Sequence, residues 1–158
     1  MTQPNAATRP DLRDPALDAA AVIVALGLAP HPEGGHYREV WRDTPSDGTR
    51  GVGTAIHFLL DAAERSHWHR VDAAELWIWQ AGGPLLLSLS PDGARVAQEI
   101  RLGPDHGGGE ALIGVVPKGW WQAARPAGGR WCLVSCTVSP AFDFAGFELA
   151  PAGWEPGA

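Results

Sequence analysis

The sequence contains very little lysine and has an excess of acidic residues. Lys118 is its one lysine, Lys and Arg together number 12 against 18 Asp and Glu, and the formal net charge is −6. A protein that binds nucleic acid needs a basic surface, because neutralising the phosphates releases counterions. This composition therefore excludes nucleic acid as a partner.

Cysteine is also scarce, and no hydrophobic run is long. Cys132 and Cys136 lie in one apparent strand, where their Cα atoms would be about 13 Å apart, too far for a disulfide. Free thiols are typical of a reducing compartment, so we expect a cytoplasmic protein. The apolar stretch 19–29 is too short to span a bilayer, and the acidic segment before it is unlike the basic start of a signal peptide. We therefore expect no membrane partner.

Glycine and proline, by contrast, are abundant, with 20 and 14 residues in a chain of 158. Such a composition favours many turns and hence short strands. A chain of this length fits one domain. We predict a disordered leader over residues 1–13, a single domain over residues 14–150 and a flexible tail over residues 151–158.

One helix and a series of short strands are expected. Asp14 followed by Pro15 predicts the start of a helix, and Gly27 predicts its end. The strand candidates are residues 36–42, 53–60, 66–70, 75–80, 85–90, 94–102, 111–116, 120–124 and 129–138. Short strands in this number predict an all-β fold, either a closed barrel or a double-sheet jelly roll.

Two histidines and a glutamate form the strongest chemical signal. His67 and His69 are two residues apart in a predicted strand, so their side chains are expected to share one face, about 6.6 Å apart along the chain. Glu75 lies in the next predicted strand, within reach of both if the strands pair antiparallel. Imidazole and carboxylate groups bind divalent metals and transfer protons. We therefore predict His69, His67 and Glu75 as catalytic residues, the alternative being a solvated surface hairpin.

Further residues are candidates for binding a ligand. Trp77 and Trp79 share a strand face with Glu75, and Trp120 lies in a second tryptophan-rich segment, although tryptophans most often fill cores. Tyr37 belongs to a strand that faces either a pocket or solvent. His57 alternates with apolar neighbours, which is more typical of a core histidine than of a ligand. The ligand-binding candidates are Tyr37, His57, Trp77, Trp79, Trp120 and Gln122.

Several segments together resemble a known family. His67-Trp68-His69, Glu75 and Gly82 are similar to the first motif of the cupin superfamily, and Pro117-Lys118-Gly119 with Gln122 is similar to the second. The segments 31–37, 56–60, 66–71, 75–77, 116–124 and 137–144 more narrowly resemble the cupin family DUF985, also called cupin-5. The resemblance extends from about residue 26 to residue 149. It implies a double-stranded β-helix, which is the cupin jelly-roll barrel, with one N-terminal α-helix, a homodimer and a pocket at the mouth of the barrel.

The metal site of cupins is altered in this sequence. Gln122 stands where the second motif usually has histidine, and a neutral amide oxygen is a poorer ligand than imidazole. The resemblance implies His67, His69, Glu75 and Gln122 as ligands of a weakly bound divalent Mn, Fe, Ni or Zn. In the alternative, no metal is bound, and the same residues form a hydrogen-bonding and proton-transfer cluster.

Three functions follow from these alternatives. The first is a pocket that binds a small polar molecule, such as a sugar or nucleotide-sugar, and acts as an isomerase or epimerase in which a histidine abstracts a proton. The second is a metal-dependent cupin enzyme, a dioxygenase or isomerase. The third is a non-catalytic binding or storage module.

Overall fold

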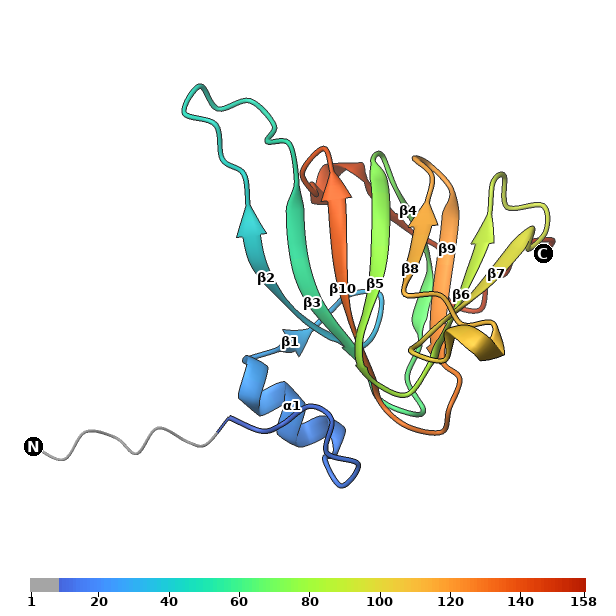
Figure 1. The fold of residues 1–158 in the computed structure, drawn as a ribbon. Helices are drawn as coiled ribbons and strands as arrows, with labels where there is room; N and C mark the ends of the chain where they lie inside the picture. The colour runs from blue at the N-terminus through green and yellow to red at the C-terminus, as the bar shows by residue number, and fades with distance from the viewer. Residues whose placement is uncertain (1–8) are drawn as a thin grey trace, which may run out of the picture.

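The computed structural model describes residues 9–158, which form two antiparallel β-sheets, one α-helix and two short 3-10 helices (Figure 1). Residues 1–8, the first part of the predicted leader over residues 1–13, lie outside the described residues. The two sheets face each other as the layers of a barrel, and the helix lies at one end of it (Figure 1). The predicted all-β jelly roll with one N-terminal α-helix is confirmed.

The two sheets differ in size. The larger has the strand order β1-β2-β3-β10-β5-β8, and the smaller has the order β11-β4-β9-β6-β7. The elements of the larger sheet are β1 (Ala29–Pro30), β2 (His36–Arg42), β3 (Thr54–Leu60), β10 (Cys132–Ser139), β5 (Ala74–Gly82) and β8 (Ile113–Val116). Those of the smaller sheet are β11 (Phe147–Leu149), β4 (Ser66–Val71), β9 (Trp121–Pro126), β6 (Leu85–Ser90) and β7 (Gln98–Leu102). The helices are α1 (Ala19–Leu26), η1 (His106–Gly108) and η2 (Phe144–Gly146).

Helix α1 starts later than the sequence predicts. Its N-cap is Asp18, whose side chain accepts a hydrogen bond of 2.9 Å from the backbone N–H of Ala21. Asp14, the predicted N-cap, instead closes a turn in which the N–H of Leu17 donates to its carbonyl oxygen. The predicted end is confirmed, because Gly27 is the C-cap with φ of 65°, a left-handed conformation that suits glycine.

The barrel has an apolar core at one end. Leu85, Leu87, Leu102 and Val134 are fully buried between the sheets. Helix α1 covers the same end, where its Val22 packs in a cluster with residues of β3 and β10. Among residues 9–158, no helix is long and apolar enough to cross a membrane.

Both ends of the described chain touch the barrel. Leu12 packs against the helix cluster, and Trp154 lies with its ring centroid 4.7 Å from that of Trp121. The predicted boundaries at residues 14 and 150 stay predictions. Cys132 and Cys136 are free and buried, so the expectation that they form no disulfide is confirmed.

Candidate functional site

A pocket of about 480 Å³ lies within the barrel, and its lining extends from Gly27, the C-cap of α1, to Val138 of β10. The strand register explains its position. Val138 near the end of β10 pairs with Glu75 near the start of β5 and with Thr54 at the start of β3. Side chains from three strands therefore converge at this end. The pocket floor is polar, formed by His31, Glu33, His69 and Glu75, and an aromatic wall is formed by Tyr37, Phe142, Phe144 and Phe147.

His69 is at the centre of the polar floor and is almost completely buried. Its Nε2 lies 2.8 Å from a carboxylate oxygen of Glu33, and its Nδ1 lies 2.7 Å from the carbonyl oxygen of His67. Because a carbonyl oxygen only accepts, Nδ1 carries a proton, and a charged ring satisfies both contacts. Burial by itself lowers the pKa of His69, but the charge of Glu33, the hydrogen bond with it and the charge of Glu75 outweigh burial and raise the pKa to about 9.

Glu33 reaches His69 from a tight turn before β2. In this turn the N–H of Gly34 donates to the carbonyl oxygen of His31, and the N–H of His67 donates to the carbonyl oxygen of Glu33, which joins the turn to β4. Gly34 has φ of 113°, and a Cβ there would overlap the backbone of a neighbouring loop. Burial by itself raises the pKa of Glu33, but the charge of His69 and the hydrogen bond with it outweigh burial and lower the pKa. Glu33 is therefore a buried carboxylate paired with an imidazolium.

Glu75 is the second buried carboxyl group of the floor. Its Oε2 accepts a hydrogen bond of 2.8 Å from Nε2 of Gln122. The amide oxygen of Gln122 in turn accepts a hydrogen bond of 2.7 Å from Nε1 of Trp77. Burial raises the pKa of Glu75 to about 7, and the charge of Glu33 adds to this rise, whereas the charge of His69 and the bond from Gln122 oppose it. Glu75 can therefore take up and release a proton near neutral pH.

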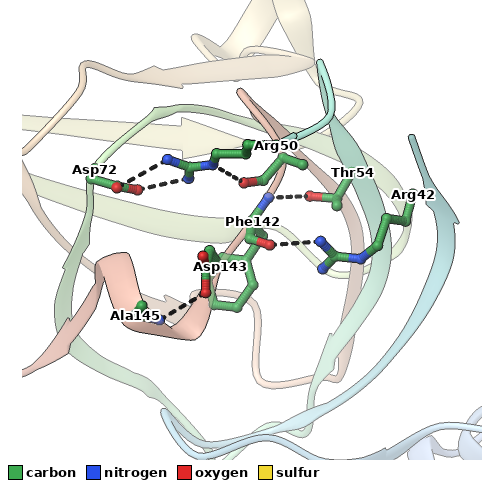
Figure 2. A network of polar contacts seen from close by, with 8 residues as sticks. Arg42, Arg50, Thr54, Asp72, Phe142, Asp143 and Ala145 are labelled. Atoms are coloured by element: carbon green, nitrogen blue, oxygen red, sulfur yellow. Dashed lines mark hydrogen bonds and ion pairs between the residues drawn. The ribbon is translucent and has the colours of Figure 1, made fainter. Parts of the chain in front are cut away.

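The loop that carries the aromatic wall is held by two arginines (Figure 2). Arg42 donates to the carbonyl oxygen of Phe142 at 2.9 Å, and Arg50 donates to that of Ala141 at 2.7 Å. Arg50 also forms two hydrogen bonds to Asp72, as Figure 2 shows. These contacts fix the backbone on which the phenylalanines stand. Phe144 is 53% exposed, so it lies at the mouth of the pocket.

His67 does not share the pocket with His69, so the prediction that the two side chains project together is wrong. Strand β4 has a bulge between Ser66 and His69, where the register with β9 shifts. A bulge inserts one residue and breaks the alternation of faces. Nε2 of His67 consequently lies 2.9 Å from the carbonyl oxygen of Pro151, and its side chain lines a separate, smaller groove with Arg125.

The other predicted ligand-binding residues divide into three groups. Tyr37 lines the pocket, with its ring in edge contact with His31. Trp77 and Gln122 are buried behind Glu75 rather than in the pocket wall. The remaining residues, Trp79, Trp120 and His57, are not among those that line the pocket.

Two residues of this last group have structural roles. Trp79 donates to the carbonyl oxygen of Gly83, and Trp120 packs against the core. His57 is on the outer face of β3, opposite Arg38. The expectation of a core histidine is therefore wrong for His57, because its neighbours Ile56 and Phe58 face the barrel interior and leave its ring partly exposed on the outer face.

The predicted metal ligands His67, His69, Glu75 and Gln122 do not fit a metal site. His67 points out of the barrel, and Gln122 directs its N–H group rather than its oxygen toward Glu75. Both ring nitrogens of His69 have other partners. In residues 9–158, no cluster of three or more His, Cys, Asp or Glu side chains has the arrangement needed to hold a metal ion. The four predicted ligands therefore do not form a metal centre in this pocket.

Sequence reasoning missed the partners of His69. By composition, the segment 31–35 predicts only a glycine-containing turn, yet it supplies His31 and Glu33 to the floor. Phe142, Phe144 and Phe147 of the aromatic wall were not predicted either. The available signal was that 31–37 and 137–144 are among the segments that resemble the family, although neither contains a known cupin motif.

Comparisons with known proteins agree with the fold. The family model described as "Cupin superfamily (DUF985)" matches residues 20–150. A crystal structure of a Shewanella oneidensis protein is 36% identical, with 85% of each chain covered and a TM-score of 0.79. A hypothetical protein from Leishmania major is 32% identical, with 87% of this chain and 90% of that chain covered and a TM-score of 0.77.

More distant similarity concerns the fold alone. A variant of oxalate decarboxylase from B. subtilis is 14% identical over 77% of this chain and 29% of that chain, with a TM-score of 0.56. At this identity, the shared barrel carries no information about activity. Among curated proteins, none matches this chain.

Proposed function

This chain belongs to the DUF985 family of the cupin superfamily. On that premise we propose that its barrel pocket binds a small polar molecule. A side chain of the pocket then transfers a proton to or from this molecule, as in an isomerase or epimerase. One observation carries the proposal. Glu75, a buried carboxyl group with a pKa of about 7, lies beside the charged His69–Glu33 pair at the floor of an open pocket. A general acid or base works best when its pKa is near the operating pH.

Within this proposal, Glu75 rather than a histidine moves the proton. His69 donates both of its N–H groups to protein oxygens, so it has no lone pair free for a substrate proton. Its charge instead stabilises negative charge on Glu33 and on a ligand nearby. The hypothesis that a histidine abstracts the proton therefore gives way to a carboxylate base with an imidazolium beside it.

The lining of the pocket supports a ligand with an apolar face and an anionic group. Phe142, Phe144 and Phe147 offer aromatic surface for the flat side of a sugar or base. Arg38 lies opposite His57 on the outer face of the sheet and donates to the carbonyl oxygen of Leu26, whereas Arg42 lies at the rim with Glu39 as its partner. A phosphate or carboxylate on the ligand would pair with Arg42 in place of Glu39. A sugar phosphate or nucleotide-sugar combines these features.

A ligand screen with two glutamate variants tests this proposal. Sugars, nucleotide-sugars and organic acids are added to the wild type, to Glu75→Gln and to the matched control Glu99→Gln, whose side chain is exposed on β7. A ligand at a hundred times its Kd stabilises the folded state by about 2.7 kcal/mol, which raises Tm by about 5–10 °C. We expect such a rise in Tm for the wild type and for Glu99→Gln. We expect proton exchange from the bound ligand to be at least about a hundredfold slower in Glu75→Gln than in the wild type. No rise with any class would contradict the proposal and favour a non-catalytic module.

We also propose that the chain forms a homodimer in a reducing cytoplasm. On the outer face of the larger sheet, Leu76 and Ile78 of β5 lie opposite Val115 and Ile113 of the edge strand β8. Ile113 and Val115 are about half exposed, which favours an apolar contact with a second copy. The free thiols support the compartment. Sedimentation equilibrium is expected to give a dimer for the wild type and a monomer for Val115→Glu. A dimer that survives this substitution would place the interface elsewhere.

A further inference from the structure

His31 is a pocket residue that the proposed proton transfer by Glu75 does not yet use. It stands in the turn before β2, with its ring centroid 4.5 Å from that of Tyr37 in edge contact and 6.3 Å from that of Phe147. Its side chain is only 6% exposed, and it lines the pocket beside the His69–Glu33 pair. A polar ring that is this buried must have hydrogen-bond partners for its nitrogens.

The hydrogen bond at Nδ1 fixes where the proton of His31 lies. The backbone N–H of Glu33 donates to Nδ1 at 3.1 Å, so Nδ1 offers a lone pair and carries no hydrogen. In a neutral imidazole the proton is then on Nε2. Protonating the ring would set an N–H at Nδ1 against the N–H of Glu33 and break this bond. The backbone of the turn therefore holds His31 as one neutral tautomer.

The Nε2–H group of His31 is left without a partner among the residues that the structure describes. Among the side-chain hydrogen bonds of residues 9–158, His31 contributes only its Nδ1. The fully buried side-chain nitrogens and oxygens that lack a partner in that range do not include Nε2 of His31. This atom is therefore reached from the open pocket. Burial and the charge of His69 lower the pKa of His31, against an opposing effect of Glu33, which agrees with a neutral ring.

We propose that Nε2–H of His31 donates a hydrogen bond to the carbonyl oxygen of the substrate, so that the substrate is a carbonyl compound with a hydrogen on the adjacent carbon. This inference rests on the proposed function of Glu75. The Glu75 carboxylate takes the proton from that carbon, and the C–H electron pair becomes a C=C bond. The π pair of the carbonyl moves onto its oxygen, where His31 and the nearby charge of His69 stabilise it. When that carbon also carries a hydroxyl group, the hydroxyl proton moves to the enolate oxygen and Glu75 returns its proton to the former carbonyl carbon. The carbonyl is thereby moved to the neighbouring carbon, which completes an isomerisation.

The tautomer can be tested without any ligand. In ¹⁵N-labelled protein, correlations between ring nitrogens and ring hydrogens identify which nitrogen of each histidine is protonated. We expect the signals of His31 to show the Nε2–H tautomer without titration between pH 5.5 and 8.5. A proton on Nδ1, or a titration in this range, would overturn the inference while leaving the role of Glu75 intact.

The hydrogen bond can be tested with a pair of probes. The first probe is α-hydroxyacetophenone, an aromatic ketone with hydrogens next to its carbonyl, and the second is phenethyl alcohol, which has a methylene in place of that carbonyl. We expect the wild type to bind the ketone at least about tenfold more tightly, in accord with one net hydrogen bond. The ketone is also expected to shift the Nε2–H signal of His31.

Two substitutions separate the nitrogens of His31. Asparagine can place an acceptor near the position of Nδ1 but reaches no farther, whereas glutamine can place an N–H near the position of Nε2. We expect His31→Asn to lose the preference for the ketone and His31→Gln to keep part of it. Glu75→Gln is expected to keep the preference and to lose exchange of the ketone's α-hydrogens in D₂O. Equal binding of both probes by the wild type would overturn the role of His31 alone, and binding of neither would overturn the proposed function as well.

Discussion

Replacing Glu33 with glutamine is expected to lower the free energy of unfolding by about 3 kcal/mol near pH 6 and by a much smaller amount near pH 9.5. Glu33 and His69 are both buried and lie 2.8 Å apart. Removing one charge of a buried pair leaves the other without compensation, and such losses are among the largest that a single substitution causes. His69 of the variant can avoid this cost only by giving up its proton.

The pH dependence follows from the direction of the shift. The pKa of His69 is about 9 in the folded protein against 6.5 for an ordinary histidine. The folded state therefore binds this proton more tightly, and the resulting stability is fully present below about pH 6.5 and is lost as the pH rises through about 9. Above that range His69 is neutral in the wild type, so removing the charge of Glu33 no longer costs an ion pair.

Urea unfolding of the wild type and Glu33→Gln at both pH values measures this effect. Glu99→Gln, the same chemical change at an exposed position of β7, serves as the control and is expected to stay within about 0.5 kcal/mol of the wild type. An equal loss for Glu33→Gln at both pH values would mean that packing, and not the ion pair, accounts for the destabilisation.

The sequence predicted the barrel better than it predicted the site. Strand alternation correctly predicted that Glu75 faces the barrel interior, whereas His57, expected as a core histidine, lies on the outer face of β3. The same rule failed for His67, because the bulge in β4 shifts the face of one residue in the pair. A bulge arises from how a strand pairs with its neighbour, here β9. The local pattern His-Trp-His contains no sign of that pairing.

The role of Glu33 depends on contacts that are distant in sequence. Within its own segment it is one residue of a glycine-containing turn, which by composition predicts only a change of direction. Its function as the partner of His69 requires β4 to lie against that turn, which the backbone bond from His67 to Glu33 secures. The aromatic wall depends likewise on the two arginines that hold its loop (Figure 2).

Replacing Gln122 with leucine is expected to destabilise the protein by about 2 to 4 kcal/mol, because it leaves two buried polar groups without partners. Gln122 is fully buried, accepts from Nε1 of Trp77 and donates to Glu75. Its bond lowers the pKa of Glu75, so the variant is also expected to hold Glu75 protonated to higher pH. Urea unfolding and infrared titration of the carboxyl group measure the two effects, with the exposed Gln98→Leu as the matched control.

The two bonds of Gln122 are expected to be coupled. Trp77→Phe removes the donor that fixes the orientation of the amide, which frees Gln122 to turn its oxygen toward Glu75. The double variant should therefore cost about 1 kcal/mol less than the sum of the single ones. If the losses of unfolding free energy simply add, or if Gln122→Leu loses less than the exposed control Gln98→Leu, the amide of Gln122 does not stabilise Glu75 through its hydrogen bond. A confirmed coupling would explain why glutamine stands at a position where cupins usually have histidine. A glutamine whose N–H faces Glu75 lowers the pKa of a proton-transfer carboxyl group. The same orientation leaves no amide oxygen for a metal.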